Sequence, residues 1–403
     1  MRVLALNCGS SSVKSALIDA GTGRRLHEMR VENIGSDHGW LYAGDVTTDL
    51  ESSTDLQSAV ARLLSEYQRV AASHAPEAVA HRVVHGGERF RTATLLDDAV
   101  LTEIDRLSVL APLHNPPAVA AIHQARRSLP NVPQLAMFDT AFHSTLPEHA
   151  REYALANDVR QRLGIRRFGF HGINHGHVAN SVAAYLQDAQ QELRIISCHL
   201  GNGASVTAIE HGRSVDTSMG LTPLEGLVMG TRGGDVDPGV LLHLLRSGEF
   251  SIEGLDQLLN KHSGLKGLTG SNDMREIEKR ANAGDEDCRR AISLYAYRTR
   301  KYIGAYAAAM GGVDVVAFTA GVGENSSLIR ARSVERLDFL GVTLDESRNR
   351  AAKVSAGRPI EEISNDSARV RVLVVRADEE LAMAREAAHA LEPRRLLAAD
   401  PKA

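Results

Sequence analysis

The sequence predicts an α/β protein of two domains, each with a polar, glycine-rich turn at the end of a strand. Predicted strands alternate with predicted helices along the chain, which is typical of α/β proteins. The 403 residues are more than one simple core needs and suit two domains of ordinary size. A strand–turn–strand pattern at the N-terminus recurs at 195–210, which suggests a duplicated domain.

The first half of the chain alternates apolar runs with turn residues. The runs Val3–Leu6 and Val13–Ile18 predict strands joined by a polar turn over 7–12. From Leu56 to Val70, apolar residues recur at helical spacing. Further along, the sequence predicts a buried strand over 79–84, a helix starting after Pro116-Pro117 and a short strand over 134–138.

The second half repeats this design. Strands over 195–198 and 206–209 flank the turn 199–205, and a long helix of about 287–310 precedes a strand over 313–319. A Gly-rich turn over 320–325 follows, and then another helix. The last predicted elements are a strand over 370–375 and a helix that Asp378 can cap, extending through Leu391. Polar residues thus follow strand ends, where open α/β sheets bind ligands.

Composition excludes several classes of protein. The net charge of −4, with 24% charged and 43% hydrophobic residues, gives no basic field for nucleic acid. Three widely spaced cysteines without a CxxC pair disfavour disulfides and a cysteine zinc site, and they fit a reducing compartment. No signal-peptide core and no run of about 18 apolar residues is present. We therefore expect a soluble, cytoplasmic protein with no membrane partner.

The Gly-rich turns indicate phosphate binding without matching a common nucleotide motif. No GxxxxGK[ST] sequence occurs, and both Gly201-Asn202-Gly203 and Gly321-Val322-Gly323 lack the third glycine of GxGxxG. A P-loop NTPase and a Rossmann dehydrogenase are therefore disfavoured. Successive backbone N–H groups and serine hydroxyls can still cradle an anion, and Lys14 adds charge beside the first turn. Any one turn is more typical of a plain strand connection, but three at strand ends favour phosphate.

Short segments of distinctive sequence run through nearly the whole chain. They are Asn7–Lys14, His81–Gly87, Phe138–His143, Gly169–Gly172, His199–Gly203, Met229–Arg232, Asp273–Arg275, Gly321–Asn325 and Asp378–Glu380. As an ordered set, these segments resemble the acetate kinase family, which shares a two-domain fold with sugar kinases, heat-shock chaperone ATPases and actin. The set is highly specific, although several segments are weak signals by themselves.

The resemblance implies two duplicated actin-like, ribonuclease H-like domains with an interdomain cleft that closes on nucleotide. The N-terminal domain would comprise 1–144 plus 376–403 and carry the acceptor side and the first phosphate turn. The C-terminal domain, 145–375, would bind nucleotide. The implied reaction is reversible transfer of the ATP γ-phosphoryl group to acetate by in-line displacement, which gives acetyl phosphate and ADP. The resemblance also implies Mg²⁺, with Mn²⁺ as an alternative, and a homodimer.

The resemblance also assigns roles at the reacting centre. Arg82 matches the arginine that grips the acceptor carboxylate, which a planar guanidinium can do through two bonds. Arg232 and His171 match residues that contact the transferring phosphoryl group. Asp139 matches an essential aspartate that donates or accepts a proton; orienting the metal or its water, or holding an arginine, is the alternative. Because the acceptor is already a carboxylate, no base is needed, and positioning and charge neutralisation dominate.

The binding residues implied by the resemblance form three groups. The acceptor's methyl group would lie against apolar side chains, which are Val84, Leu113, Phe170 and Pro223. The metal would be bound by Asn7 and Glu379, at opposite ends of the chain. The nucleotide would contact Lys14, His199, Leu200, Gly201, Asn202, Gly203, Asp273, Met274, Arg275, Gly321, Val322, Gly323, Glu324 and Asn325. Ordinary structural roles are alternatives: the apolar residues could simply pack in the core, and Glu379 could stabilise a helix N-terminus through the helix dipole.

Two departures and three alternatives remain open. The family's usual Thr-Ser-His after Phe-His-Gly is here Ile173-Asn174-His175, and its Thr-Arg-Ser-Gly-Asp has Gly233 in place of serine. His171 and His175, four residues apart, also allow a zinc site with His177, although the intervening glycines argue against a regular helix. The alternatives to acetate are propionate or butyrate as acceptor. A non-catalytic nucleotide switch of the actin and chaperone type is the alternative from another class.

Overall fold

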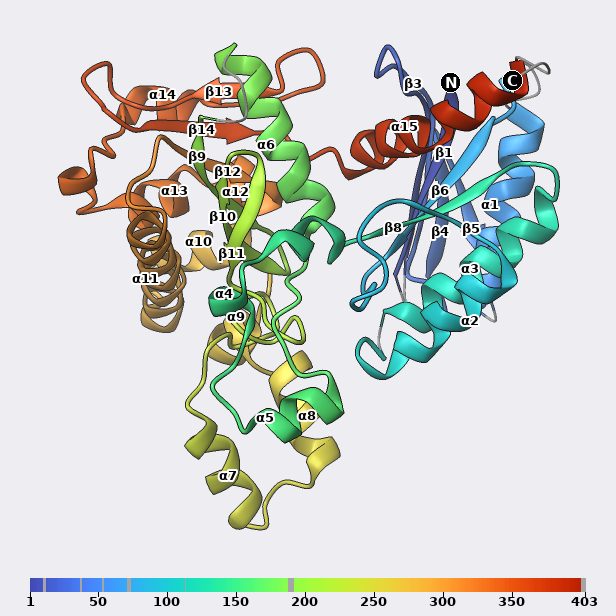
Figure 1. The fold of residues 1–403 in the computed structure, drawn as a ribbon. Helices are drawn as coiled ribbons and strands as arrows, with labels where there is room; N and C mark the ends of the chain where they lie inside the picture. Colours follow the sequence, from blue (N-terminus) through green and yellow to red (C-terminus); the bar gives the residue numbers. More distant parts are fainter. Residues whose placement is uncertain are drawn as a thin grey trace. The chain divides into compact units, whose positions relative to one another are not determined.

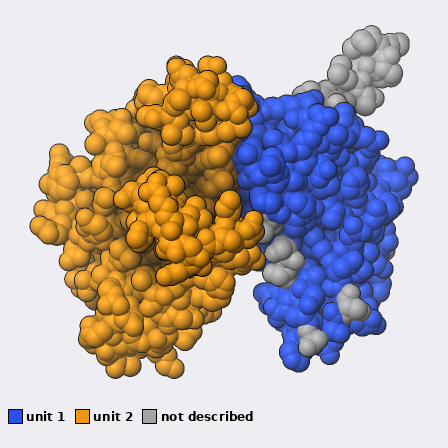
Figure 2. All heavy atoms as spheres, turned by 90° about the horizontal axis from the view of Figure 1, so that it is seen from below, with its two compact units in different colours: residues 1–142, 378–403 blue, residues 143–377 orange. Residues whose placement is uncertain are grey.

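The computed structural model describes residues 1–9, 12–36, 38–52, 54–70, 74–112, 114–187 and 192–399. Ser10 and Ser11 of the first predicted phosphate turn, and Leu113 of the predicted acceptor pocket, lie outside the described residues. The described chain divides into two compact units, coloured separately in Figure 2. Unit 1 comprises Met1–Phe142 and Asp378–Ala403, and unit 2 comprises His143–Ala377.

Unit 1 is built on a sheet with the strand order β5-β4-β3-β2-β1-β6-β8-β7. Its strands are β1 (Arg2–Cys8), β2 (Val13–Asp19), β3 (Arg25–Glu32), β4 (Gly39–Ala43), β5 (Val46–Leu50), β6 (Ala78–Val83), β7 (Thr94–Leu95) and β8 (Gln134–Phe138). Its helices are α1 (Leu56–Val70), α2 (Asp98–Arg106), η1 (Leu107–Val109), α3 (Asn115–Ser128) and α15 (Glu379–Ala399), and η2 (Ala141–Thr145) crosses the boundary between the units.

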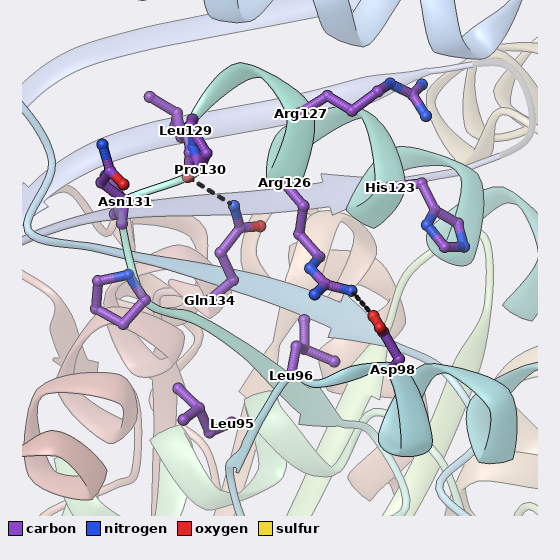
Figure 3. Close-up of a pocket in the computed structure, with 12 residues that line it drawn as sticks. Leu95, Leu96, Asp98, His123, Arg126, Arg127, Leu129, Pro130, Asn131 and Gln134 are labelled. Atoms are coloured by element: carbon purple, nitrogen blue, oxygen red, sulfur yellow. Dashed lines mark hydrogen bonds and ion pairs between the residues drawn. The ribbon is translucent and has the colours of Figure 1, made fainter.

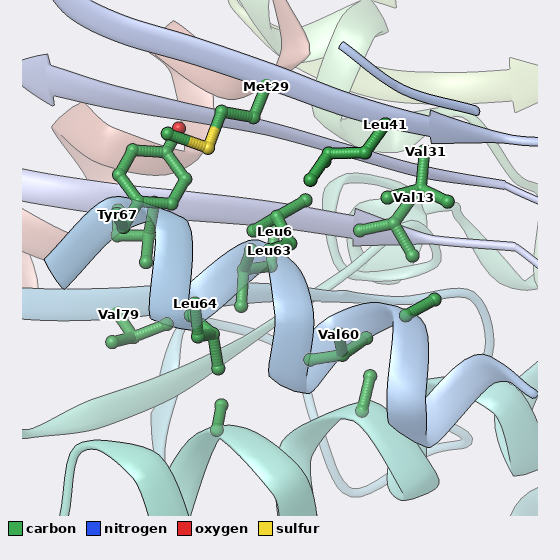
Figure 4. Close-up of a cluster of buried hydrophobic side chains, with 14 of the residues drawn as sticks. Leu6, Val13, Met29, Val31, Leu41, Val60, Leu63, Leu64, Tyr67 and Val79 are labelled. Carbon is green, nitrogen blue, oxygen red and sulfur yellow. The ribbon is translucent and has the colours of Figure 1, made fainter. Parts of the chain in front are cut away.

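Apolar periodicity explains how α1 packs on this sheet. Its residues Val60 and Leu63 are fully buried in one cluster with Leu6 and Val13 of the first two strands (Figure 4). Helix α15, from the other end of the chain, packs against β1, β2 and β6 (Figure 1). Asp378 begins it by accepting a hydrogen bond from the backbone N–H of Leu381 at 3.1 Å, as the capping prediction required.

Unit 2 is built on a sheet with the strand order β11-β10-β9-β12-β14-β13. Its strands are β9 (Arg194–Leu200), β10 (Ala204–Glu210), β11 (Arg213–Thr217), β12 (Val315–Thr319), β13 (Ile360–Glu362) and β14 (Arg371–Val375). Its helices are α4 (Glu148–Arg151), α5 (Asn157–Leu163), α6 (Gly172–Leu186), α7 (Pro238–Arg246), α8 (Ile252–Lys261), α9 (Gly264–Thr269), α10 (Met274–Asn282), α11 (Glu286–Ala309), α12 (Ala320–Asn325), α13 (Ser327–Val334), η3 (Asp338–Leu340) and α14 (Glu346–Ala351).

The same topology occurs in both units. In β3-β2-β1-β6-β8 and in β11-β10-β9-β12-β14, the first two pairings are antiparallel and the last two are parallel. The predicted α/β class and the predicted duplication are therefore confirmed. Parallel strands end at one edge of a sheet, so β1, β6 and β8 of unit 1 bring their carboxyl ends together, as do β9 and β12 of unit 2.

Two local predictions were wrong. The segment 320–325, predicted as a turn, is the short helix α12, in which Thr319 is the N-cap residue. Gly172 and Gly176 were taken as evidence against a regular helix, but α6 runs without interruption from Gly172 to Leu186. Burial of Ile173, Val178 and Val182 along this helix outweighs the low helix propensity of glycine. Among the described helices, none is both long enough and apolar enough to span a bilayer.

Candidate active site

Side chains from four segments of unit 1 meet at the carboxyl ends of its parallel strands. Arg82 in β6 donates from Nε to both carboxylate oxygens of Asp139, at 3.1 and 3.2 Å, and from Nη2 to Oδ2. Its Nη1 donates to Oδ1 of Asn7 in β1 at 3.1 Å. Asn7 in turn donates from Nδ2 to Oε2 of Glu379 at 3.3 Å. The two chain ends thus meet in one cluster, as the predicted pairing of Asn7 with Glu379 required.

The electrostatics of this cluster hold Arg82 charged. Asp139 is only 1% exposed, so its ion pair with Arg82 is shielded from water. Desolvation lowers the pKa of Arg82, but the charges of Asp139 and Glu379 outweigh it and raise that pKa above its ordinary value. Desolvation raises the pKa of Glu379, and the positive charge of Arg82 opposes this. Among the described residues, Asp139 and Asn7 use three of the five N–H groups of Arg82, which leaves two for another anion.

A second cluster forms in unit 2, where His171 and Arg232 meet the turn after β9. A Cβ atom placed on Gly203 would lie 2.8 Å from Nη2 of Arg232 and 3.2 Å from Nε2 of His171. The same guanidinium donates from Nη1 to the carbonyl oxygen of Pro223 at 2.8 Å. Three segments that are far apart in sequence therefore place a cation and an imidazole over a stretch of glycine backbone.

Arg232 differs from Arg82 in its electrostatic surroundings. No carboxylate of the described residues forms an ion pair with it, and desolvation is what shifts its pKa. Desolvation lowers the pKa of Arg232 to about 10, so the side chain stays charged at neutral pH. A half-buried cation without a counter-ion is costly, and binding of an anion would relieve that cost.

His171 is held from behind by α6 and β10. His171 directly precedes α6, and its φ of 57° lies in the left-handed region that residues other than glycine seldom adopt. Its Nδ1 forms a hydrogen bond with the hydroxyl of Ser205 at 2.9 Å, and its ring stacks on His199 with 4.1 Å between centroids. Asn174, one of the three residues that depart from the family pattern, donates from Nδ2 to Nδ1 of His199 at 2.8 Å.

The predicted nucleotide segments gather around the ends of β9 and β12. His199 pairs with Thr319 in the parallel ladder, and a Cβ on Gly201 would lie 3.8 Å from Cβ of Ala320, so the two glycine-rich segments are adjacent. Asn272 donates to Oδ1 of Asn202 at 3.0 Å, which brings the segment 273–275 to the same place. The side chains of Leu200 and Met274 are buried in the core, so these two residues offer only backbone groups.

The remaining predicted site residues are divided between the units. Lys14 is exposed on β2 and lies opposite Asn7 in the β1–β2 pairing, so it belongs with the unit 1 cluster and not with the other nucleotide residues. Val84 lies in unit 1, whereas Phe170 and Pro223 lie in unit 2. That Arg82 converges with His171 and Arg232 therefore stays a prediction.

Sequence reasoning assigned no role to two residues that support the unit 2 cluster. Ser205 lies in β10, directly after the turn that follows β9; the sequence showed a polar residue there but not its partners. Arg330 in α13 is fully buried and donates from Nη1 to the carbonyl oxygens of Gly323 and Glu324, at 3.0 and 2.8 Å. Arg330 thereby provides hydrogen bonds to carbonyl oxygens at the C-terminal end of α12 that have no partner within the helix. An arginine on a helix usually faces solvent, so no pattern in the sequence marked this one.

A surface pocket of about 670 Å³ lies elsewhere on unit 1. Gln134, at the start of β8, is among the residues that line it (Figure 3). Asp139 follows the other end of the same strand. Arg126 on one wall pairs with Asp98 at 2.7 Å. Apolar residues, among them Leu96, line much of the rest, and none of the lining residues belongs to the predicted site.

Comparison with known proteins identifies close relatives over nearly the full chain. The sequence model of the Acetokinase family matches residues 2–385. Acetate kinase from Streptomyces coelicolor is 49% identical over 391 residues, which cover 95% of each chain. The crystal structure of Porphyromonas gingivalis acetate kinase has a TM-score of 0.90 and 39% identity, covering 97% of this chain and 100% of that one. A propionate kinase from Francisella tularensis has a TM-score of 0.90 and 36% identity, covering 96% of this chain and 98% of its own.

Proposed function

The chain belongs to the acetokinase family, and we propose that it transfers the γ-phosphoryl group of ATP reversibly to acetate by in-line displacement, giving acetyl phosphate and ADP. The observation that carries the proposal is the position of Arg232. A desolvated guanidinium, for which the described residues supply no counter-ion, lies beside an imidazole, over glycine backbone at the end of a strand. That arrangement suits a group whose negative charge is spread over several oxygens.

We assign nucleotide binding and phosphoryl contact to unit 2. The backbone of Gly203 lets phosphate oxygens approach closely, because a side chain there would collide with Arg232 and His171. Arg232 would donate to the equatorial oxygens of the transferring group, and His171 would donate from Nε2. The adjacent segments 273–275 and 320–325 would hold the adenosine part of ATP.

We assign the acceptor to unit 1. The two N–H groups that Arg82 keeps for another anion can hold an acetate carboxylate. Asp139 then acts by fixing the guanidinium, which agrees with the alternative of an aspartate that holds an arginine. No general base is required in this scheme, because the attacking oxygen is already deprotonated.

The oxygen atoms near Arg82 also fit Mg²⁺, or Mn²⁺ in its place. Asn7 and Glu379 supply an amide and a carboxylate oxygen within one hydrogen-bonded group. No group of three or more His, Cys, Asp or Glu suited to a metal is found among the described residues. This agrees with Mg²⁺, which uses few protein ligands together with water and substrate phosphates. When bound, the ion would neutralise phosphate charge, while Asn7 and Glu379 would orient it.

Acetate is preferred over propionate because the curated relatives with 45–49% identity are acetate kinases. The propionate kinase from Francisella tularensis keeps propionate as the second candidate. One methylene shifts the preference between the two acids by only about 1–3 kcal/mol, so the shape of the apolar lining around the acceptor decides which acid is preferred. We propose Val84, Leu113, Phe170 and Pro223 for that lining.

Turnover with a series of acids tests the proposal. Acetate, propionate and butyrate would be compared by trapping the acyl phosphate with hydroxylamine, for wild type and Arg232→Ala. Arg246→Ala is the matched control, because Arg246 is an exposed arginine at the end of α7. We expect acetate to be the best acceptor and Arg232→Ala to lose about 10²-fold or more in kcat. ADP release without a trapped acyl phosphate would instead favour a nucleotide switch.

A homodimer and a cytoplasmic location stay predictions. Light scattering on the purified chain tests the first: a mass of 43.5 kDa would contradict it, and twice that value would support it.

A further inference from the structure

A line of alternating hydroxyl and imidazole groups runs from the interior of unit 2 to His171. Ser197 of β9 contacts Nδ1 of His175 at 2.9 Å, and Nε2 of His175 contacts the hydroxyl of Ser205 at 2.7 Å. The same Ser205 hydroxyl contacts Nδ1 of His171 at 2.9 Å. Ser197, His175 and Ser205 are each 0% exposed, so water does not compete for these bonds.

We propose that Ser197, His175 and Ser205 are positioning residues that fix His171 as the neutral tautomer with its proton on Nε2. His171 then presents an N–H donor, and not a lone pair, beside Gly203 and Arg232. The inference rests on the proposed function only where it assigns that donor to the transferring phosphoryl group. The order of protons along the line follows from this chain's own contacts.

The proton count begins at Ser197. Burial lowers the pKa of His175 well below its ordinary value, so this ring is neutral and carries one N–H. Within the described part of the chain, His175 is the one hydrogen-bond partner of the Ser197 hydroxyl. Ser197 must therefore donate to Nδ1 of His175, because otherwise its buried proton would have no acceptor.

The rest of the line follows from that first bond. Because Nδ1 of His175 accepts, the proton of this ring lies on Nε2 and is donated to Ser205. The Ser205 hydroxyl is then free to donate to Nδ1 of His171, which must accept. The proton of neutral His171 is left on Nε2, the atom that a Cβ on Gly203 would approach to 3.2 Å. The opposite order would leave the Ser197 proton unsatisfied.

This arrangement has a chemical consequence for phosphoryl transfer. A histidine with its proton on Nδ1 would direct a lone pair at phosphate oxygens, and it could donate from Nε2 only after taking up a second proton. With the proton fixed on Nε2, His171 donates from this atom in its neutral form as well as in its protonated form. Activity that depends on this donor would therefore persist at alkaline pH, where an unfixed imidazole would lose part of it.

Nitrogen NMR of the histidine side chains tests the tautomer without reference to activity. In wild type, His171, assigned by comparison with His171→Gln, should show a protonated Nε2 and an unprotonated Nδ1. Ser197 makes no contact with His171, but Ser197→Ala removes the bond that keeps the proton of His175 on Nε2. The proton of His175 could then move to Nδ1, and His171 should become a mixture of tautomers. Ser205→Ala should do the same, and Ser205→Thr, which keeps the hydroxyl, should restore the wild-type pattern. Ser214→Ala is the matched control, since this buried serine contacts His143 instead, at 2.8 Å.

Kinetics supply the second readout. We expect Ser197→Ala and Ser205→Ala to lose about tenfold in kcat at pH 8 and less at pH 6, with the KM for acetate unchanged. A proton on Nδ1 in wild type, or unchanged His171 signals in both alanine variants, would overturn the inference. If the tautomer responds as expected but His171→Gln keeps full turnover, the positioning line stands and the phosphoryl contact in the proposed function fails.

Discussion

Gly203→Ala should separate activity from stability in unit 2. The new methyl group would lie 2.8 Å from Nη2 of Arg232, closer than non-bonded atoms tolerate, and 3.2 Å from Nε2 of His171. The colliding atom of Arg232 is the far end of a flexible side chain, so the guanidinium can move away at little cost. Gly203 does not have a left-handed φ, so alanine fits its backbone without strain. The perturbation therefore displaces the two proposed donors and leaves the fold intact.

The size of the effect follows from that displacement. Moving a preorganised donor by about 1 Å costs about 10²-fold in rate, and losing one altogether costs about 10²–10³-fold, or about 2.7–4 kcal/mol. We therefore expect kcat to fall by about 10²-fold or more. The free energy of unfolding should change by less than about 1 kcal/mol, because loss of unfolded-state entropy offsets part of the crowding.

Hydroxamate formation and thermal unfolding measure the two quantities on the same samples. Gly304→Ala is the matched control: it adds a methyl group to α11 with no heavy atom within 4 Å, and it should keep full activity while gaining up to about 1 kcal/mol in stability. If Gly203→Ala turns over within threefold of wild type, the position of Arg232 over this turn does not matter to the chemistry. A collapse in stability would refute the argument that the guanidinium simply moves.

Three further predictions concern a loop, an acid transition and domain motion. Gly233→Ser should be tolerated, because a Cβ atom there meets only ordinary contacts, the nearest at 3.8 Å. Gly234→Ala should unfold or inactivate the chain, because its Cβ atom would lie 2.3 Å from backbone carbonyl oxygens and the residue has a φ of 74°. Thermal unfolding distinguishes the two variants. Burial lowers the pKa of His81 in the folded chain to about 4, so the folded state disfavours the protonated ring that the unfolded state accepts below pH 6.5. About 3 kcal/mol of the free energy of unfolding is therefore lost as the pH falls from 6.5 to 4. Urea unfolding should show a weaker loss of stability at acid pH for His81→Gln. Solution scattering should show compaction with nucleotide plus acetate, and an unchanged radius of gyration would contradict domain closure.

Local signals explain why most of the fold was predictable. The run Gln134–Phe138 is entirely buried and was predicted to the residue, because a short apolar run that ends at an aspartate marks both the strand and its end. The same logic located β1, β6, β9 and β12, and with them the polar residues at their carboxyl ends. Helix α12 was missed because six residues with two glycines show no helical period, and its stability comes from contacts such as those of Arg330.

The supporting residues were harder to predict because their partners lie on other elements. Ser197 and His199 alternate along β9, and Ser205 and Thr207 alternate along the neighbouring strand. The β9–β10 register pairs Ser205 with His199 and Thr207 with Ser197, so all four side chains share one face of the sheet. A buried face is normally apolar, and every polar group placed there must find a partner. Asn174 and His175 of α6 supply hydrogen-bond partners to three of these four side chains. The alternation of polar residues along the two strands can be read from the sequence, but only the folded structure shows that α6 provides the partners.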